Sequence, residues 1–208
     1  YKRAVEQGAW GVETQPAPME LNIPAIKGIG DSLLYFVDRY DGNSAHGGNN
    51  VTIYDIDFVP IAGAPRIPEG AGLTYVDHLT HNVHRGRMDE WAGFYERLFN
   101  FRELRYFDIE GKLTGLKSKA MTSPCGKIRI PINESSDDKS QIQEYLHAYH
   151  GEGIQHVAFG TNDVYATVDA LSLKKVPFQT TPATYYEQLD TRIPNHGEDS
   201  ARLQALSI

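Results

Sequence analysis

The sequence predicts an α+β fold in which one small module of strands and a helix occurs twice. Residues 75–83 and 151–160 each form an apolar strand pattern with a histidine near its middle. Each pattern leads, after a short connection, into an amphipathic helical pattern. Because each copy would present an imidazole from its first strand, we expect a metal site where the two copies meet.

The composition predicts a folded protein whose partners are small molecules. The 208 residues suffice for one large or two small domains, and a hydrophobic fraction of 40% is typical of globular proteins. A net charge of -7 without any basic cluster argues against a nucleic-acid partner. Cys125 is the only cysteine, which excludes a disulfide framework and fits a reducing compartment. The sequence has no apolar run of about 18 residues, so we expect a cytoplasmic protein without a membrane contact.

The first part of the chain predicts short elements followed by a linker. Residues 1–11 have the pattern of a helix end that runs into a strand edge. Small polar residues at 41–50 predict an exposed loop. Strands are expected at residues 20–27, 32–40 and, with clean alternation, 53–59.

Residues 60–72 are rich in proline and glycine, which is typical of a linker between domains. We therefore place a domain boundary near residue 72. Residues 1–72 are expected to be the end of one domain, and residues 73–208 most of another.

The first module follows the order strand, helix, strand, strand, strand. An aromatic stripe on one face predicts a helix over residues 88–99, and packing in a core explains this stripe. A turn at residues 123–126 predicts that the last two strands form a hairpin. The three strands are expected at residues 102–109, 116–122 and 127–132.

The second module repeats only the beginning of this order. A helix over residues 140–149 precedes its histidine strand. Asn162 or Asp163 then caps another amphipathic helix. Phe178 begins a further strand, and residues 185–189 form a helical turn.

Strand geometry decides which of the eight histidines are candidate ligands. Neighbouring side chains of a strand alternate between its faces, so His78 and His81 point to opposite sides and cannot bind the same ion. His78 and His156 remain, because each occupies the equivalent place in its module. Alternation likewise separates His84 from His81. His147 and His150 lie near the end of a helix, where an imidazole interacts favourably with the helix dipole without binding a metal.

Two neutral imidazoles and one carboxylate, with open positions left on the ion, form the arrangement that suits Fe(II) and O2. The chain offers the two imidazoles, but the pattern identifies no carboxylate on a late strand. The acidic residues near the second module are expected in turns, caps or loops as solvated charges: Glu152, Asp163, Glu187, Asp190 and Glu198.

Several motifs together resemble the 4-hydroxyphenylpyruvate dioxygenases, in the same order and over nearly the whole chain. An ordered set of this kind is much more specific than any one motif. The matching segments are residues 53–58 (IYDIDF), 77–83 (DHLTHNV), 115–121 (GLKSKAM), 129–134 (RIPINE), 140–146 (SQIQEYL), 153–158 (GIQHVA) and 184–186 (TYY).

The resemblance implies a vicinal-oxygen-chelate fold of βαβββ modules in curved half-barrel sheets, with a non-catalytic N-terminal domain and a metal-binding C-terminal one. It implies that His78 and His156 bind Fe(II) together with a glutamate on a late strand. No segment of these 208 residues matches that strand. The chain also opens within a helical pattern and stops in an apolar run, so we expect a fragment that lacks both ends.

The resemblance also implies four substrate-binding residues, namely Ser118, Asn133, Gln141 and Gln155. Their hydroxyl and amide groups can orient a phenol or a keto acid by hydrogen bonds. Each has a simpler alternative: Ser118 as an ordinary strand residue, Asn133 as a turn former and Gln141 as an exposed helix residue. Alternation turns Gln155 away from the face that His156 uses.

The implied reaction converts 4-hydroxyphenylpyruvate and O2 to homogentisate and CO2 in tyrosine breakdown. The resemblance further suggests a homo-oligomer. Two alternatives remain open. One is 4-hydroxymandelate synthase, which uses the same substrate, metal and fold, and the other is a metal-free binding module of this fold.

Overall fold

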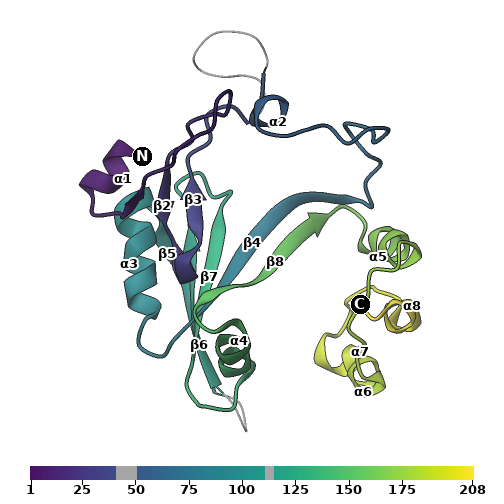
Figure 1. Cartoon of the computed structure of the whole chain (residues 1–208). Helices are drawn as coiled ribbons and strands as arrows, with labels where there is room; N and C mark the ends of the chain where they lie inside the picture. Colours follow the sequence, from purple (N-terminus) through teal and green to yellow (C-terminus); the bar gives the residue numbers. More distant parts are fainter. Residues whose placement is uncertain (41–50, 111–114) are drawn as a thin grey trace. The chain divides into compact units, whose positions relative to one another are not determined.

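The structure is a computed structural model that describes residues 1–40, 51–110 and 115–208. It contains both helices and mixed sheets, which confirms the α+β class (Figure 1). The loop expected at residues 41–50 lies outside the described residues. No helix in the described part of the chain combines the length and the apolar character needed to cross a bilayer.

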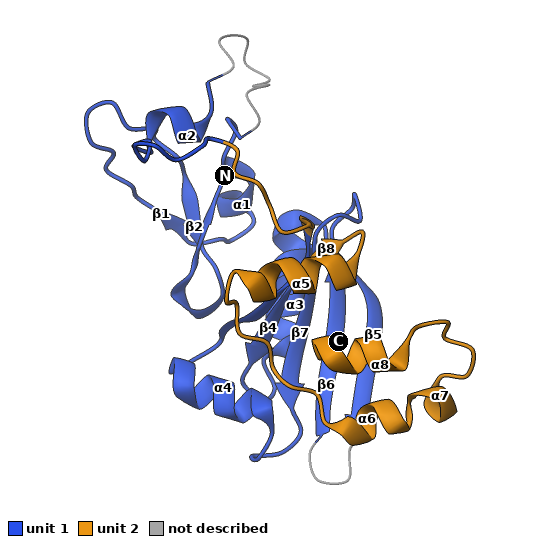
Figure 2. Cartoon of the chain, turned by 90° about the vertical axis from the view of Figure 1, so that its right-hand side faces the viewer, with its two compact units in different colours: residues 1–66, 76–158 blue, residues 67–75, 159–208 orange. Residues whose placement is uncertain are grey.

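The chain divides into two compact units whose segments alternate along the sequence (Figure 2). One unit contains residues 1–66 and 76–158, and the other contains residues 67–75 and 159–208. Both candidate histidine ligands belong to the first unit. The domain boundary near residue 72 stays a prediction, since these units follow a different division.

The first unit begins with a small antiparallel sheet in the order β1-β2-β3. The predicted helix end and the first two predicted strands are confirmed, although the elements are shorter than expected. Gly30 adopts a φ of 56°, and a Cβ at this position would lie 1.9 Å from the carbonyl oxygen of Glu152, so only glycine fits there. The elements are α1 (Lys2–Glu6), β1 (Gly11–Val12), β2 (Ala25–Lys27), η1 (Ile29–Asp31) and β3 (Leu33–Tyr35).

The strand predicted at residues 53–59 is wrong, because α2 (Ile53–Ile56) forms there instead. The Asp55 carboxylate accepts a hydrogen bond of 2.8 Å from the Thr52 backbone N–H and closes a capping box. Tyr54 and Phe58 are both more than half exposed, so the alternating pattern buries no face against a sheet. Local capping therefore decides the structure of this segment.

A five-stranded sheet in the order β5-β6-β7-β4-β8 carries the candidate site. The pairs β5-β6 and β6-β7 are antiparallel, whereas β4 lies parallel to β7 and pairs Asn82 with Asn133. The predicted hairpin turn is confirmed by the 2.9 Å hydrogen bond from the Gly126 N–H to the Ser123 carbonyl. The strands are β4 (Leu73–Val83), β5 (Arg102–Glu110), β6 (Gly115–Thr122), β7 (Arg129–Ser135) and β8 (Gly153–Thr161).

Helix α3 (Met88–Phe99) has the predicted bounds and packs its apolar face on this sheet. Glu134, which is buried, accepts hydrogen bonds from the N–H groups of Gly86 and Met88 at the start of the helix. A carboxylate is favourable there because the free N–H groups of a helix N-terminus carry partial positive charge. The buried core comprises Ile29, Val83, Met88, Ala92, Tyr95, Phe101, Met121, Ile130 and Ile132.

Two further predicted helices are confirmed, one before β8 in the sequence and one after it. Helix α4 (Gln141–Tyr149) begins after Ser140, whose hydroxyl accepts a hydrogen bond from the Gln143 N–H. Helix α5 (Val164–Leu173) begins after Asp163, whose carboxylate accepts from the Ala166 N–H at 3.0 Å. The cap at Asp163 is one of the two that the sequence predicted, whereas the cap at Ser140 was not predicted.

The strand predicted from Phe178 is wrong, since the described residues 174–208 form helices and loops but no strand. Pro177 and Pro182 flank the segment and remove two of the N–H donors that a strand needs. The second module therefore continues as helices around a small core of Tyr186, Leu189 and Leu203. These helices are α6 (Ala183–Glu187), which confirms the predicted helical turn, α7 (Leu189–Arg192) and α8 (Ser200–Leu206).

Candidate metal centre

The neighbouring strands β4 and β8 bring His78 and His156 together. The centroids of the two imidazole rings lie 5.5 Å apart, and the ring planes are inclined by 74°. The two strands come from different copies of the predicted module. The structure thus contains the pair of imidazoles on which the sequence hypothesis depends.

The preceding residue holds each of these two imidazoles. Asp77 accepts a hydrogen bond of 2.8 Å from Nδ1 of His78 through its carboxylate oxygen Oδ1. The amide oxygen of Gln155 accepts a hydrogen bond from Nδ1 of His156. Because both partners are acceptors, Nδ1 of each ring carries the hydrogen and Nε2 keeps its lone pair, which is the form that coordinates a metal.

Thr80 completes the surroundings of His156 and was not predicted from the sequence. Its hydroxyl lies 2.9 Å from Nε2 of His156 and donates a hydrogen bond to that nitrogen. Strand alternation places His78, Thr80 and Asn82 on one face, so the spacing that selected His78 also contained this signal. Burial and then the nearby His78 lower the pKa of His156, which favours its neutral form.

A cavity of about 480 Å3 adjoins His156. Three of the four residues implied to bind substrate line it: Asn133, Gln141 and Gln155. Asn82 lines it as well and extends the row of amide groups. Ser118 is not among the lining residues but is buried on β6 directly opposite Asn133, where it has the character of a strand residue. The cavity can therefore offer several neutral hydrogen-bonding groups to a polar ligand.

The expectation that Gln155 points away from the face of His156 is wrong. Its amide oxygen contacts Nδ1 of His156, and both residues line the same cavity. Alternation fixes the direction in which a Cβ leaves the strand, but a long exposed side chain can fold back over its neighbour. The alternative for Asn133 as a turn former is also wrong, because Asn133 lies within β7.

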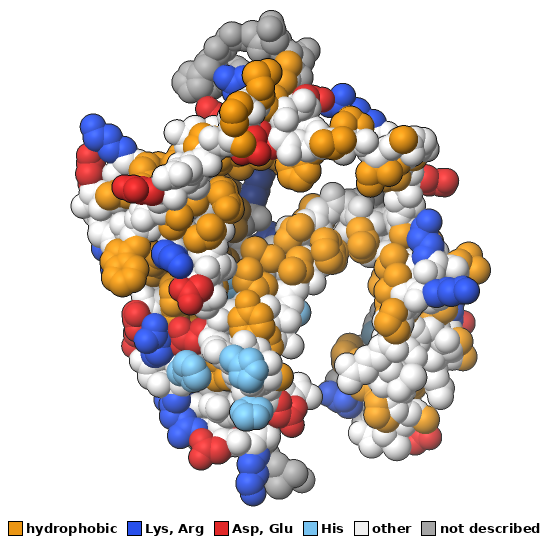
Figure 3. All heavy atoms as spheres, viewed as in Figure 1, with side chains coloured by type: hydrophobic (Ala, Val, Ile, Leu, Met, Phe, Trp, Pro, Cys, Tyr) orange, Lys and Arg blue, Asp and Glu red, His pale blue; other side chains and the backbone are white. Residues whose placement is uncertain are grey.

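The histidines that were set aside lie outside the pair. Figure 3 shows histidine side chains gathered on the surface, where His84, His147 and His150 are exposed around a shallow cavity of about 380 Å3. Within residues 1–40, 51–110 and 115–208, no group of three or more His, Cys, Asp or Glu side chains has the geometry to hold a metal ion. The glutamate that the resemblance implies as the third ligand stays an expectation.

His81, which strand alternation excluded from the ion bound by His78, is a core residue. Its ring is 1% exposed, and its Nε2 forms a hydrogen bond of 2.6 Å with the Tyr95 hydroxyl. Burial lowers the pKa of His81 to about 4 and raises that of Tyr95. The buried pair is thus neutral at physiological pH.

We expect His81 to make the folded protein less stable in mild acid. Unfolded, this imidazole takes up a proton near pH 6.5, but in the folded protein it does so only near pH 4. The free energy of unfolding therefore loses this contribution as the pH falls below 6.5, by about 2 kcal/mol at pH 5. Urea unfolding of the native protein and of His81→Gln at pH 7.5 and pH 5 measures this. If both proteins lose the same stability between the two pH values, His81 is not responsible.

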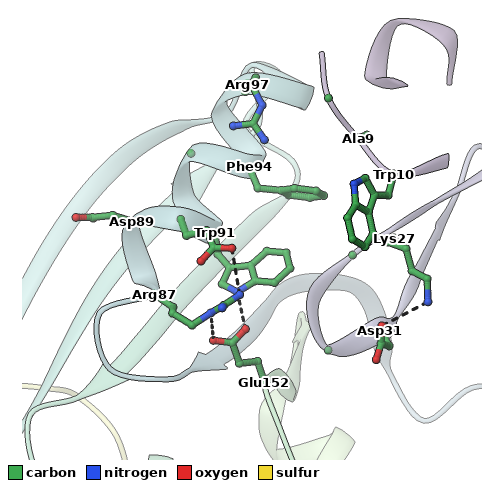
Figure 4. A pocket seen from close by; sticks show the side chains of 15 residues that line it. Ala9, Trp10, Lys27, Asp31, Arg87, Asp89, Trp91, Phe94, Arg97 and Glu152 are labelled. Atoms are coloured by element: carbon green, nitrogen blue, oxygen red, sulfur yellow. Dashed lines mark hydrogen bonds and ion pairs between the residues drawn. The ribbon is translucent and has the colours of Figure 1, made fainter. Parts of the chain in front are cut away.

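Glu152 was expected to be a solvated charge, and this expectation is wrong. The residue is only 7% exposed, and Figure 4 shows its carboxylate between the side chains of Arg87 and Trp91. Its Oε2 accepts a 2.7 Å hydrogen bond from the Trp91 indole N–H, and its Oε1 lies 2.8 Å from Nε of Arg87. Oε1 also accepts from the backbone N–H of His84 at 3.0 Å. Glu152 thereby joins the start of β8 to the end of β4 and to α3.

The other four acidic residues are exposed, as predicted. Asp163 caps α5, and Glu187 is at the end of α6. Asp190 pairs with His196 at 2.7 Å, and Glu198 accepts a hydrogen bond of 2.6 Å from the Tyr165 hydroxyl. None of the four belongs to the unit that contains the histidine pair.

Comparison with known families identifies the superfamily to which the chain belongs. The sequence model of the glyoxalase/bleomycin resistance protein/dioxygenase superfamily matches residues 75–192, which is more than half of the chain. The chain belongs to this superfamily. A model described as hydroxyphenylpyruvate dioxygenase, HPPD, N-terminal matches residues 1–59. The resemblance to 4-hydroxyphenylpyruvate dioxygenases and the implied vicinal-oxygen-chelate fold are thus confirmed.

Two relatives support the same family, and one solved structure supports the fold. The chain is 58% identical to a 4-hydroxyphenylpyruvate dioxygenase of Pseudomonas aeruginosa, over 99% of the chain and 55% of that protein. It is 57% identical to Hemolysin VllY of Vibrio vulnificus, over 100% of the chain and 56% of that protein. A mutant 4-hydroxymandelate synthase from Streptomyces coelicolor has the same fold, with a TM-score of 0.74 and 22% identity over 99% of the chain and 57% of that structure. The chain spans about half the length of these relatives.

Members of this superfamily are in general metal-dependent, and the histidine pair fits a metal ion. With a metal-to-nitrogen distance of about 2.1 Å, two imidazoles on one ion have ring centroids about 4.5 Å apart at a right angle and about 6.4 Å apart in a straight line. The observed 5.5 Å lies within this range. The ring nitrogens also fit, since Nδ1 of each ring is bound to an acceptor, which leaves Nε2 of His78 for a metal and Nε2 of His156 as well once the Thr80 hydroxyl turns its hydrogen away.

Proposed function

We propose that the protein to which this chain belongs is an Fe(II)-dependent 2-keto acid dioxygenase that converts 4-hydroxyphenylpyruvate and O2 to homogentisate and CO2. The observation that carries the proposal is the pair His78 and His156 beside a cavity lined with amide groups. The 58% identity to a protein named for this reaction supports it. Because the chain spans about half of that relative, the activity is proposed for the whole protein.

The side chains around the cavity would bind and orient the substrate. The amides of Asn133, Gln141 and Gln155 can donate hydrogen bonds to a carboxylate or keto oxygen and accept one from a phenol. His78 and His156 would hold the Fe(II), which when bound supplies the activation of O2. With both Nδ1 atoms bound to acceptors, the neutral form of each ring has its lone pair on Nε2, the nitrogen that would coordinate. The chain thus contributes positioning, and no protein nucleophile is needed.

Product analysis tests this function against its alternatives. The full-length protein is incubated with 4-hydroxyphenylpyruvate, O2 and Fe(II), and the products are separated by chromatography, with a chelator in place of Fe(II) as the control. We expect homogentisate only in the sample that contains Fe(II). Hydroxymandelate would instead identify the 4-hydroxymandelate synthase reaction. Binding of the keto acid without any product would identify a binding module.

The setting of the reaction belongs to the same proposal. We infer a cytoplasmic homo-oligomer that acts in tyrosine breakdown, with a 2-keto acid and O2 as its small-molecule partners. We also propose that residues 1–72 end a non-catalytic domain and that residues 73–208 belong to the metal-binding one. The separate family matches to residues 1–59 and 75–192 support this boundary.

A further inference from the structure

Asp77 connects one candidate metal ligand to a cation on another strand. Its Oδ1 accepts a hydrogen bond of 2.8 Å from Nδ1 of His78, and its Oδ2 accepts one of 2.7 Å from Nη1 of Arg129. Arg129 begins β7, which is the strand on the other side of β4 from β8. Each oxygen of the carboxylate therefore has its own partner, which fixes the plane of the group and the direction from which it meets the imidazole.

The two candidate ligands differ in the charge of the group behind them. Nδ1 of His78 donates to a carboxylate, whereas Nδ1 of His156 donates to the neutral amide of Gln155. A carboxylate behind an imidazole pulls the Nδ1 proton toward itself and makes Nε2 a stronger electron donor to a metal. His78 should accordingly be the stronger ligand of the pair.

The Asp77 side chain is 32% exposed and that of Arg129 is 45% exposed. Ion pairs with this exposure contribute little to folding stability, because water screens the charges. The sheet is already held by backbone pairing of β7 with β4 and β6. A role limited to fold stability therefore explains little about why this carboxylate lies directly behind His78.

We propose that Asp77 is a positioning residue, which orients His78 and strengthens it as a ligand for a divalent metal, and that Arg129 holds Asp77 in place for this role. The inference rests on the proposed function, because it assumes that His78 binds a metal. It adds a residue that supports that ligand from behind and that the family resemblance did not suggest.

Metal affinity, measured apart from catalysis, tests the proposal. The dissociation constant of the full-length protein for Co(II), used as a spectroscopic probe, is measured by competition with a chelator. We expect Asp77→Ala to weaken binding about 10- to 100-fold, the usual effect of removing an outer partner of a metal-bound histidine. Asp77→Asn should weaken it less, because the amide oxygen still accepts from Nδ1 but carries no charge.

A matched control separates this effect from loss of a surface charge. Asp138 forms an ion pair of 2.8 Å with Arg85 in the same unit, and its side chain is 90% exposed. Asp138→Asn removes the same charge from a pair that touches neither histidine. It should leave the Co(II) dissociation constant unchanged, and the melting temperatures of Asp138→Asn and Asp77→Asn should differ little.

Three outcomes distinguish the proposed role of Asp77 from the proposed metal site itself. If His78→Ala abolishes Co(II) binding while Asp77→Ala and Asp77→Asn bind as the native protein does, the role of Asp77 is overturned and the metal proposal stands. If His78→Ala leaves binding unchanged, the metal proposal itself fails. If Asp77→Asn lowers the melting temperature without changing the dissociation constant, Asp77 serves the fold alone and the inference is wrong.

Discussion

Replacing His156 by alanine is expected to lower the affinity of the full-length protein for Fe(II) by more than about 100-fold, and to abolish product formation. Loss of a partner behind a metal ligand costs about 10- to 100-fold in affinity, so loss of the ligand itself should cost more. His156 is also the candidate ligand that lines the cavity, so the proposed metal and substrate would be bound side by side. Chelator competition gives the affinity, and chromatography gives the product.

His147→Ala is the matched control for this experiment. It removes an exposed imidazole from α4, outside the pair, and should change neither the affinity nor the product. Equal affinities for the native protein and His156→Ala would contradict the assignment of the metal to β4 and β8. A loss of affinity in His147→Ala as well would point to the surface group of histidines instead.

Glu152→Ala is expected to lower the free energy of unfolding by about 3 kcal/mol. The buried carboxylate is the partner of the Trp91 indole N–H, of the His84 backbone N–H and of Arg87. Its removal leaves two donors without their acceptor, which is costly in a buried position, and takes from Arg87 the shorter of its two ion pairs. Urea unfolding at neutral pH measures the change.

Glu90→Ala provides the comparison, since Glu90 pairs with the same Arg87 at 3.1 Å but is exposed. Exposed ion pairs contribute little to stability, so this variant should unfold close to the native protein. Similar losses in the free energy of unfolding of both variants would mean that burial does not increase the contribution of Glu152 to stability. The Glu152→Ala protein should also show weaker metal binding, because the residue joins β8 to the end of β4.

The elements with strong periodicity could be predicted from the sequence. Helix α3 has the predicted bounds because its aromatic stripe repeats at helical spacing and packs in the core of the sheet. The segments at residues 53–59 and after Phe178 were predicted wrongly for the opposite reason. Their apolar residues find no sheet to cover them, so the cap formed by Asp55 in one case and the flanking prolines in the other decide the structure.

The pair of candidate ligands could be predicted because it depends on one comparison between two similar strands. The groups around the pair could not, since they depend on which strands become neighbours. Arg129 reaches Asp77 only because β7 lies parallel beside β4, and Thr80 reaches His156 only because β8 lies on the other side. The burial of Glu152 likewise follows from the packing of α3 against the strand ends.

Gly30 lies in η1, the turn between β2 and β3, and comes very close to the carbonyl oxygen of Glu152. This turn therefore helps to set the position of the strand that bears His156. A backbone oxygen cannot swing aside as a flexible side chain does, so any larger residue at position 30 must displace the beginning of β8. Substitutions far from the histidines in sequence can thus change how the two imidazoles face each other. Substitution of this glycine is expected to weaken binding of the proposed metal.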